Sequence, residues 1–340
     1  MRVAIIGAGA WGTGLAQHVA RRHPVFLAAR DRAHAQAMGA TRTNDRYLPG
    51  ISLHPAIQTG ADTGELLAWL TGADEALLVM ASPVAGLAAA LAQVVPGLPP
   101  NCRGVVWLCK GIDPHEALLP HRIAAPWLAG RPAGALSGPS FAQEVAQGLP
   151  VALTIAGTSE AIQRLAIEAF HHGAARIYTS DDLVGVELGG ALKNVMAIAA
   201  GISDGLSLGA NARAALITRA IAEMSRLGVA LGARAETFMG LTGLGDLVLT
   251  CTGGLSRNRK VGLALAGGER TEVILARLGH VAEGVWTAPV ARRLAREAAV
   301  DMPIVEAVCA VLEGRAGAAQ AVAALLAREP RSENEKGLDR

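Results

Sequence analysis

The chain has 340 residues, of which 51% are hydrophobic and 18% are charged. This length suggests two domains of ordinary size, and the apolar content is enough to bury a sizeable core and to exclude a disordered protein. The formal net charge is only +2, so the chain carries no strong overall field and we expect no nucleic-acid partner. A few local cations could still hold a small anionic ligand.

The cysteines give no sign of a metal site or of a disulfide framework. No pair has C-x-x-C spacing, and no His/Cys cluster has zinc spacing. We therefore expect no metal, and reduced thiols in a cytoplasmic protein. We also expect no signal peptide, because the N-terminus passes directly into an apolar strand. The cysteines are Cys102, Cys109, Cys251 and Cys309.

One uncharged stretch, residues 76–101, is long enough to pass for a membrane span. Prolines interrupt it, and Ser82-Pro83 is typical of a turn. We interpret the stretch as a strand, a turn and a helix (Val84–Val95), and we expect no membrane span.

The first half of the chain alternates short apolar runs with Ala-rich helical stretches. This rhythm predicts an α/β domain over residues 1–181, in which helices cover both faces of a doubly wound, mainly parallel sheet. The predicted strands are Arg2–Ile6, Pro24–Ala28, Glu75–Val79, Gly104–Cys109, Ala133–Leu136, Ala152–Ala156 and Ala175–Thr179.

From Asp182 onward the pattern becomes helical, which predicts a mostly α-helical second domain over residues 182–327. The charged tail, residues 328–340, is expected to be frayed. The predicted helices are Leu183–Asp204, Asn211–Leu227, Ala235–Met239, Asn258–Ala266, Thr271–Leu278, Ala288–Glu297 and Ile304–Leu312.

A glycine-rich turn follows the first predicted strand. Gly7, Gly9 and Gly12 have G-x-G-x-x-G spacing and open a predicted helix, Thr13–Arg22, the context in which such a turn binds a dinucleotide. Gly7 would permit the tight turn, Gly9 would let the backbone approach a pyrophosphate, and Gly12 would let the helix pack on the strand. The helix N-terminus would offer N–H groups and a positive dipole to the phosphates. The alternative is a tight turn that binds nothing.

Arg30 and Asp31 follow the second predicted strand. An acid near this point usually contacts the ribose hydroxyls of NAD, and an arginine can receive the 2′-phosphate of NADP. We interpret Arg30 as the ribose-side contact, which would make NADP usable. The alternative is a solvated loop.

Lys193 lies in an almost wholly apolar helical segment, residues 186–200. No carboxylate stands at helical spacing from it, so a buried Lys193 would need a tertiary carboxylate or a ligand. Asp246 is a plausible partner. A desolvated lysine suits proton transfer, because burial lowers the pKa of an ammonium group. Two alternatives stay open: Lys193 could extend to the domain surface, and Asp246 could cap a helix.

Residues 253–260 (GGLSRNRK) combine a flexible turn, a capping residue, Ser256, and a basic first helical turn. Cations are unfavourable at a helix N-terminus unless an anion is present. A phosphate there would be held by N–H groups, the Ser256 hydroxyl and an arginine fork. The alternative is a basic surface patch, and binding of nucleic acid has little support because no aromatic residues interleave.

Two further loops follow predicted strands, at the edge of the sheet where ligands bind. Lys110 follows the strand Gly104–Cys109 and could be a cation in a cleft. Ser140 follows Ala133–Leu136. It could instead cap a helix that begins at Phe141, with Gln143 completing a capping box.

Together these motifs resemble the bacterial type of NAD(P)-dependent glycerol-3-phosphate dehydrogenase, over nearly the whole chain from Arg2 to about Pro303. The stretches at 187–206 and 243–262 are long and the most specific. The matching stretches are GAGAWGTGLA (7–16), TNDRYLPGI (43–51), CKGI (109–112), LSGPSFAQEVA (136–146), ELGGALKNVMAIAAGISDGL (187–206), NARAALITRAIAEM (211–224) and GLGDLVLTCTGGLSRNRKVG (243–262).

The resemblance implies a Rossmann-like N-terminal domain, a helical C-terminal domain and an active site in the cleft between them. It implies Lys193 as general acid/base, with Asp246 and Lys110 also catalytic, and a cytoplasmic homodimer that feeds phospholipid synthesis. Positions matching substrate contacts in the family are Lys110, Gly138, Ser140, Lys193, Asp246, Ser256, Arg257 and Asn258. Positions matching the cofactor surroundings, besides the three motif glycines, are Trp11, Arg30, Lys110, Ala142, Arg257, Val281 and Glu283.

The chain departs from the family pattern on the cofactor side. Pro83-Val84 stands where Pro-Ser is usual, Gly14 replaces a more usual Ala, and residues 28–31 lack the Trp often found before the Arg. These departures bear on the preference between NAD and NADP, and not on the reaction.

The expected reaction is hydride transfer from NADH or NADPH to C2 of dihydroxyacetone phosphate, with a proton from Lys193 to the carbonyl oxygen and the phosphate held by Arg257 and Ser256. Two rivals stay open. One is another reductase of the same architecture, such as a hydroxy-acid or imine reductase, against which the Gly-Gly-Leu-Ser-Arg-Asn segment argues. The other is a non-catalytic nicotinamide sensor, against which the joint presence of Lys193, Asp246 and Arg257 argues.

Overall fold

The computed structural model describes residues 1–128, 130–278 and 282–328. The chain forms two compact units, Met1–Glu187 and Leu188–Arg340. The division falls inside one long helix, α8 (Leu183–Gly205), whereas the predicted boundary at 181/182 lies just before that helix.

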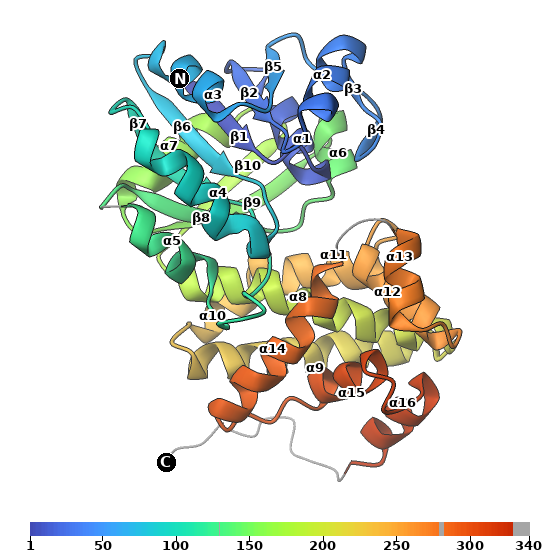
Figure 1. The fold of residues 1–340 in the computed structure, drawn as a ribbon. Coiled ribbons are helices and arrows are strands. Elements are labelled where there is room, and N and C mark those ends of the chain that lie inside the picture. Colours follow the sequence, from blue (N-terminus) through green and yellow to red (C-terminus); the bar gives the residue numbers. More distant parts are fainter. Residues whose placement is uncertain (129, 279–281, 329–340) are drawn as a thin grey trace. The chain divides into compact units, whose positions relative to one another are not determined.

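The first unit is built on one sheet. Within the described residues its eight strands lie in the order β10-β9-β8-β7-β6-β1-β2-β5 (Figure 1). Neighbouring strands are parallel except β8 and β9, so β9 and β10 run opposite to the others. All the predicted strands are present, and the predicted α/β class with a mainly parallel sheet is confirmed. The strands are β1 (Arg2–Ile6), β2 (Val25–Ala28), β5 (Ile57–Gly60), β6 (Ala76–Met80), β7 (Cys102–Trp107), β8 (Ala133–Ser137), β9 (Val151–Gly157) and β10 (Ala175–Ser180).

The predicted strands do not include β5 or a short antiparallel pair, β3 (Thr43–Asn44) and β4 (Leu48–Ser52). β5 is an edge strand of sequence IQTG, and β4 contains Pro49 and Gly50. Edge strands need no continuous apolar run, and Pro and Gly normally indicate a loop. The period-two signal was therefore too weak in both.

Alternate residues of each strand enter two separate cores. In β1, Val3 and Ile5 lie in one core and Ala4 in the other, as the two-residue period of a strand requires. Helices α1, α2 and α7 close the first core, and α3, α4 and α5 close the second. The helices of this unit are α1 (Ala10–Val19), α2 (Arg32–Thr41), α3 (Thr63–Thr71), α4 (Leu87–Val94), α5 (Pro120–Leu128), α6 (Ala142–Gln147) and α7 (Glu160–Phe170).

Two predicted helices in this unit had wrong limits. The helix predicted over Thr13–Arg22 begins at Ala10, because Gly9 already occupies the position before its first turn. The helix predicted over Val84–Val95 begins and ends in 3₁₀ turns, and only Leu87–Val94 is α-helical. Such turns are common at helix ends.

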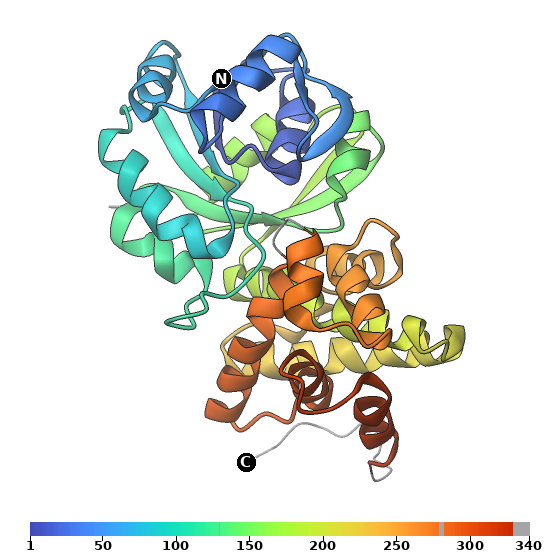
Figure 2. The same cartoon turned by 45° about the vertical axis from the view of Figure 1, so that its right-hand side comes forward.

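The second unit is helical throughout its described residues (Figure 2). The predicted helices do not include α11, α16 or a π-helical turn, η3 (Leu241–Gly245). The predicted helix Ala288–Glu297 starts later than α14, which has Pro289 in its interior. Both views show α15 and α16 side by side. The helices after α8 are α9 (Gly209–Ala230), α10 (Ala235–Phe238), α11 (Asp246–Thr252), α12 (Arg257–Ala266), α13 (Thr271–Leu278), α14 (Glu283–Glu297), α15 (Pro303–Leu312) and α16 (Ala318–Leu326).

Of the tail that was expected to be frayed, only Arg328 is among the described residues. Its guanidinium contacts the carboxylate of Asp301 at 2.5 Å. Residues 329–340 lie outside the described part of the chain.

Glycines allow α12 to lie directly on α8. A Cβ on Gly201 would stand 2.1 Å from the carbonyl oxygen of Arg259, and one on Gly262 would stand 2.1 Å from that of Ile198. Only bare backbone permits such an approach on both helices. The crossing brings the N-terminal turn of α12 beside the middle of α8.

By length and hydropathy alone α8 could cross a membrane, as could the bent pair formed by residues 235–252 and 257–266. However, 83% of the most apolar window of α8 is buried within the protein. A helix that is apolar all round and buried is typical of a protein core. The stretch 76–101 forms β6, a 3₁₀ turn and α4, as predicted.

Candidate active site

The glycine turn after β1 has the geometry that a bound pyrophosphate needs. Gly7 has a φ of +118°, and a Cβ there would lie 2.7 Å from the backbone of Ala81. A Cβ on Gly12 would lie 2.0 Å from the carbonyl oxygen of Gly7, so this glycine lets α1 pack on the turn. By contrast, no described atom lies within 4 Å of a Cβ on Gly9. The space at Gly9 is therefore open to a ligand.

The N-terminus of α1 leaves polar groups to satisfy. Gly9 is its N-cap, and no side chain of the described residues caps it. The indole Nε1 of Trp11 is buried with no hydrogen-bond partner among the described residues. A buried donor without an acceptor costs about 1–3 kcal/mol. These donors fit a ligand that carries phosphate and ribose oxygens, so the residues present suit a dinucleotide.

Arg30 and Asp31 differ in what they contact. The Asp31 carboxylate accepts a hydrogen bond from the backbone N of His34 at 2.9 Å and thereby caps α2. This bond lowers the pKa of Asp31. Arg30 is exposed and makes no hydrogen bond or ion pair with the described residues. The geometry therefore favours Arg30 over Asp31 as a ligand contact.

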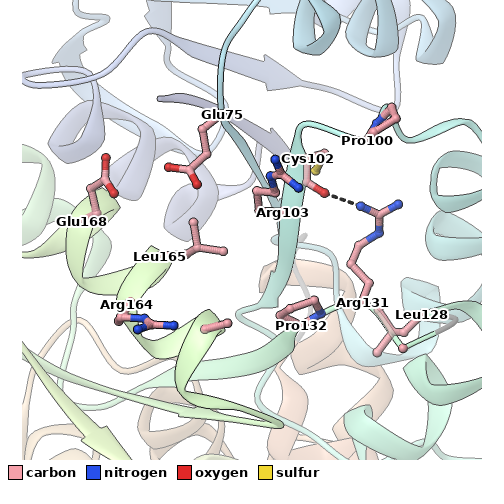
Figure 3. Close-up of a pocket in the computed structure, with 12 residues that line it drawn as sticks. Glu75, Pro100, Cys102, Arg103, Leu128, Arg131, Pro132, Arg164, Leu165 and Glu168 are labelled. Carbon is pink, nitrogen blue, oxygen red and sulfur yellow. Dashed lines mark hydrogen bonds between the residues drawn. The ribbon is translucent and has the colours of Figure 1, made fainter.

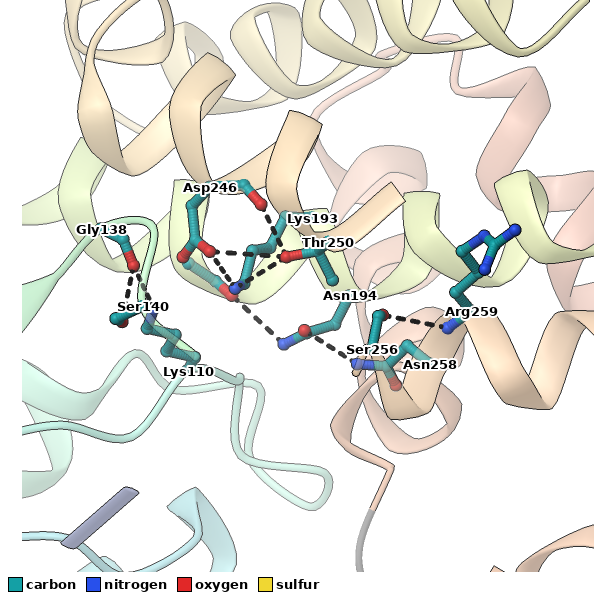
Figure 4. A network of polar contacts seen from close by, with 11 residues as sticks. Lys110, Gly138, Ser140, Lys193, Asn194, Asp246, Thr250, Ser256, Asn258 and Arg259 are labelled. Carbon is teal, nitrogen blue, oxygen red and sulfur yellow. Dashed lines mark hydrogen bonds and ion pairs between the residues drawn. The ribbon is translucent and has the colours of Figure 1, made fainter. Parts of the chain in front are cut away.

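Lys110 and Ser140 lie at the carboxyl ends of β7 and β8, and both point to one carbonyl group (Figure 4). Nζ of Lys110 donates to the carbonyl oxygen of Gly138 at 2.8 Å, and Oγ of Ser140 donates to the same oxygen at 2.9 Å. Gly138 has a φ of +133°, and a Cβ there would lie 3.0 Å from the carbonyl oxygen of Ala152. Three residues predicted from two separate loops thus form one cluster.

The alternative role of Ser140, as the cap of a helix beginning at Phe141, is wrong. The helix α6 begins at Ala142, its N-cap is Phe141, and no side chain caps it in the described chain. Gln143, the expected partner in the capping box, donates instead to the carbonyl oxygen of Pro49 at 3.4 Å. Ala142 itself approaches α1, since a Cβ on Gly14 would lie 2.7 Å from its carbonyl oxygen.

Lys193 is buried and ion-paired, so the alternative of a lysine extending to the surface is wrong. Lys193 is 7% exposed to solvent. Nζ donates to the carboxylate of Asp246 and, at 3.1 Å, to Oγ1 of Thr250 (Figure 4). Oγ1 of Thr250 in turn donates to the carbonyl oxygen of Asp246 at 2.6 Å. The predicted pairing of Lys193 with Asp246 is confirmed.

A close backbone approach brings these residues together. A Cβ on Gly189 would lie 2.6 Å from the carbonyl oxygen of Thr242, so α8 touches the π-helical turn η3 directly. The turn ends at Gly245, and Asp246 is the first residue of α11. Such turns are frequent at functional sites. The N-cap of α11 is Gly245, so the alternative role of Asp246 as a helix cap is wrong.

At the start of α12 the polar side chains mainly contact the protein. Ser256 is the N-cap, and its Oγ accepts from the backbone N of Arg259 at 3.2 Å. Nδ2 of Asn258 donates to Oδ1 of Asn194 at 2.9 Å, and its Oδ1 accepts from the backbone N of Gly284 at 3.0 Å. Both are buried. Both side chains therefore hold the first turn of α12 in place through hydrogen bonds to the protein.

Two arginines of the same turn, Arg257 and Arg259, differ in what they contact. Arg259 pairs with Asp204 at 2.7 Å. Arg257 is exposed and makes no hydrogen bond or ion pair with the described residues. The charge of Arg257 acts on the carboxyl group of Glu283. Burial raises the pKa of Glu283 to about 7, although the Arg257 charge opposes that rise. Arg257 is therefore the cation suited to an anionic ligand. Val281, predicted near the cofactor, lies outside the described residues.

The predicted site residues do not include Thr250 or Asn194. Thr250 stands one helical turn after Asp246, so once Asp246 was assigned to Lys193, the (i, i+4) spacing could have identified it. Asn194 follows Lys193 directly and points to a different helix. No pattern along the chain signals that contact, because it depends on the crossing of α8 and α12.

A separate pocket lies in the first unit at the amino ends of the strands, opposite to the carboxyl ends that carry Lys110 and Ser140. It has a volume of about 700 Å³ and is lined by residues at the amino ends of β6, β7 and β8, including Glu75, Arg103 and Arg131 (Figure 3). In doubly wound sheets ligands bind at the carboxyl ends of the strands. None of the predicted site residues lines this pocket, so it is not the candidate active site.

Comparison with known proteins identifies the family. The chain matches the N-terminal part of NAD-dependent glycerol-3-phosphate dehydrogenase over residues 2–163 and its C-terminal part over residues 182–323. The chain belongs to the NAD-dependent glycerol-3-phosphate dehydrogenase family. The predicted family and the predicted nicotinamide-dependent oxidoreductase are thereby confirmed.

Individual relatives are similar over their whole length. A glycerol-3-phosphate dehydrogenase (NAD(P)+) from Ralstonia nicotianae is 57% identical, over 98% of this chain and 99% of the relative. One from Burkholderia cenocepacia is also 57% identical, over 98% of this chain and 100% of the relative. The crystal structure of glycerol-3-phosphate dehydrogenase from Coxiella burnetii has a TM-score of 0.88 and 40% identity, covering 96% of this chain and 99% of that one.

Proposed function

We propose that the protein interconverts dihydroxyacetone phosphate and sn-glycerol 3-phosphate, with NAD(H) or NADP(H) as cofactor and Lys193 as general acid/base. In the reducing direction, ketone, NAD(P)H and a proton give the alcohol and NAD(P)+. The observation that best supports this is the buried Lys193–Asp246 pair with Thr250 beside it. A buried lysine held by a carboxylate and a hydroxyl suits proton transfer to one fixed point.

The glycine turn and the N-terminus of α1 would hold the cofactor. Its pyrophosphate would lie at Gly9, and the indole N–H of Trp11 would gain an acceptor. Arg30 would face the ribose, where it can pair with a 2′-phosphate. When bound, the nicotinamide supplies the hydride that reduces C2 of the ketone.

Lys193 would donate a proton to the carbonyl oxygen as negative charge develops on it. An ammonium group has three N–H donors, of which one points to Asp246 and one to Thr250. These contacts fix the direction of the group before the reaction, which is the condition for effective electrostatic stabilisation. In the oxidising direction the same amine would take the proton from the alcohol.

The N-terminus of α12 would hold the substrate phosphate. Arg257 provides the guanidinium, the N–H groups of the first turn provide further donors, and Ser256 and Asn258 keep that turn in place. Binding at the phosphate, away from C2, would orient the carbonyl. Lys110, with Gly138 and Ser140, would provide a second cation near the reacting group.

The remaining parts of the proposal follow from the family. We propose that the protein is a cytoplasmic homodimer and that its product feeds phospholipid synthesis. Size-exclusion chromatography with light scattering tests the dimer directly, and a monomer at micromolar concentration would contradict it.

The deciding experiment is the loss of absorbance at 340 nm when the purified protein meets dihydroxyacetone phosphate, with NADH and with NADPH in turn. Rapid loss with either cofactor is expected. The variant Arg30→Ala should reduce the rate with NADPH and leave the rate with NADH nearly unchanged. Cofactor binding without turnover would contradict the proposal and favour a nicotinamide sensor. Faster turnover of an unphosphorylated hydroxy-acid substrate would favour another reductase.

A further inference from the structure

Glu187 is a buried carboxylate that the proposed reaction does not use. Its side chain is 0% exposed. It accepts hydrogen bonds from the indole Nε1 of Trp107 at 2.8 Å, from the backbone N of His121 at 2.9 Å and from Nδ1 of His121 at 2.6 Å. All three residues belong to the first unit.

The two donors stand at opposite ends of one loop. Trp107 is the last residue of β7, and His121 lies in the first turn of α5. The segment between them, residues 108–119, carries Lys110. Within it, the carboxylate of Asp113 accepts from the backbone N of His115 at 3.0 Å and from that of Glu116 at 2.7 Å. The loop therefore has internal order, and Glu187 links the residue that precedes it, Trp107, to His121, which follows it.

A contribution to folding stability does not by itself explain why a carboxylate stands at this buried position. Burial raises the pKa of Glu187, and the three donors act against that rise. Replacing a buried charge and its partners by apolar groups is often neutral or stabilising, so such a group contributes more to geometry than to free energy. The core to which its partner Trp107 belongs is apolar, and it includes Val186 and Ala124. A carboxylate here does what an apolar side chain cannot, because it accepts from two segments at once.

We propose that Glu187 is a positioning residue for Lys110: by joining Trp107 to His121 it fixes the loop that sets the place of the Lys110 ammonium at the end of β7. The contact of Lys110 with the carbonyl oxygen of Gly138 depends on that placement. The proposal rests on the proposed function, in which Lys110 assists at the reacting carbonyl. A misplacement of about 1 Å at such a group can lower a rate by about a hundredfold.

The test combines Glu187→Ala and Glu187→Gln with Lys110→Ala. Glu187→Ala should lower kcat for dihydroxyacetone phosphate by about tenfold to a hundredfold, with the Kd of NADH unchanged. Glu187→Gln keeps an acceptor oxygen for Trp107 and for the backbone of His121, so it should retain most of kcat. In the Lys110→Ala background, Glu187→Ala should cause less than about a twofold further loss, since coupled residues are not additive.

Glu223→Gln is the matched control. Glu223 is also a buried acid that accepts from a backbone N, that of Ile304 at 3.0 Å, but both residues belong to the second unit, whereas the loop belongs to the first. It should leave kcat unchanged. If Glu187→Ala lowers kcat equally with and without Lys110, or does not lower it at all, Glu187 does not act through Lys110 and the proposal is overturned.

A measurement without substrate separates this proposal from the proposed function. Amide hydrogen exchange of residues 108–119 should become faster in Glu187→Ala and stay at the wild-type rate in Glu223→Gln. If the wild-type protein fails to reduce dihydroxyacetone phosphate, the proposed function fails, while faster exchange would still support the loop anchor. Unchanged exchange in Glu187→Ala would overturn the anchor whatever the substrate.

Discussion

Nδ2 of Asn258 donates to Oδ1 of Asn194 over 2.9 Å, and this bond joins the residue after Arg257 to the residue after Lys193. The side-chain oxygen of the same Asn258 accepts from the backbone N of Gly284, at the start of α14. One buried side chain thus links three helices of the second unit. It sets the spacing between the proposed phosphate cation and the proposed proton donor.

The first prediction concerns this link. Asn258→Ala removes the donor to Oδ1 of Asn194 and the acceptor for the backbone N of Gly284. The loss of one partner of a buried hydrogen bond costs about 1–3 kcal/mol. We expect a higher KM for dihydroxyacetone phosphate and a lower kcat, with an unchanged Kd for NADH. Steady-state kinetics and cofactor fluorescence titration measure these quantities.

The control for this prediction is Asn101→Ala. Asn101 donates through its amide to the carbonyl oxygens of Leu70 and Ala73, in the first unit and at the other edge of the sheet. Its loss should lower the unfolding temperature without raising KM. If Asn258→Ala changes stability as Asn101→Ala does and leaves KM untouched, the Asn258 link is structural only.

The second prediction concerns the buried ion pair. Lys193→Ala should lower kcat by about 10²–10⁴-fold, the usual contribution of a general acid/base, while NADH still binds. The same variant takes the Lys193 ammonium away from the buried Asp246 carboxylate, and breaking a buried ion pair by removing one partner costs about 3–5 kcal/mol. The double variant Lys193→Met with Asp246→Asn removes both charges, so it should recover much of the stability but none of the activity.

The comparison of these two variants separates chemistry from folding. Unfolding by urea gives the stability of each, and turnover with dihydroxyacetone phosphate gives the activity. Recovery of turnover in the double variant would mean that Lys193 is not the proton donor and that its loss had acted only by unpairing Asp246.

The third prediction separates cofactor binding from folding in the glycine turn. A Cβ on Gly9 meets no described atom within 4 Å, whereas one on Gly7 would meet the backbone of Ala81 at 2.7 Å and strain a φ of +118°. Gly9→Ala should therefore fold with a nearly unchanged unfolding temperature but bind NADH and NADPH more weakly. Gly7→Ala should lose stability as well.

Thermal unfolding with and without NADH measures both effects. Cofactor binding stabilises the native state in proportion to the logarithm of ligand concentration over Kd, so Gly9→Ala should show a smaller shift than the wild type. A wild-type shift in Gly9→Ala would place the pyrophosphate elsewhere.

A feature could be predicted from the sequence where it depends on residues that are neighbours along the chain. The strand-turn-helix at Gly7–Gly12 and the capping position of Ser256 depend on neighbouring residues, and the structure has both. The Lys193–Asp246 pair was predicted because an isolated lysine in an apolar helix requires a distant carboxylate. Asn194 and Glu187 were not identified, because their partners lie far away along the chain. The partner of Asn194 is set by the crossing of α8 with α12, and those of Glu187 are Trp107 and His121. No spacing along the chain encodes these contacts.

The fourth prediction concerns a buried acid outside the proposed site. Burial raises the pKa of Glu223 from its usual 4.5 to about 7. Between these values the folded protein keeps a proton that the unfolded chain has released, so stability falls as pH rises from about 4.5 to about 7 and is constant above. A shift of this size corresponds to about 3 kcal/mol. The glutamine of Glu223→Gln is neutral at every pH, so the stability of this variant does not fall for this reason.

The difference in unfolding free energy between Glu223→Gln and the wild type should therefore become more favourable to the variant as pH rises from 4.5 to 8. Urea unfolding at a series of pH values measures it. The variant Asn101→Ala gives the control and should show no comparable trend, because an amide does not titrate in this range. A constant difference across this range for Glu223→Gln would mean that its two contacts with the backbone N of Ile304 keep the carboxylate ionised in spite of its burial.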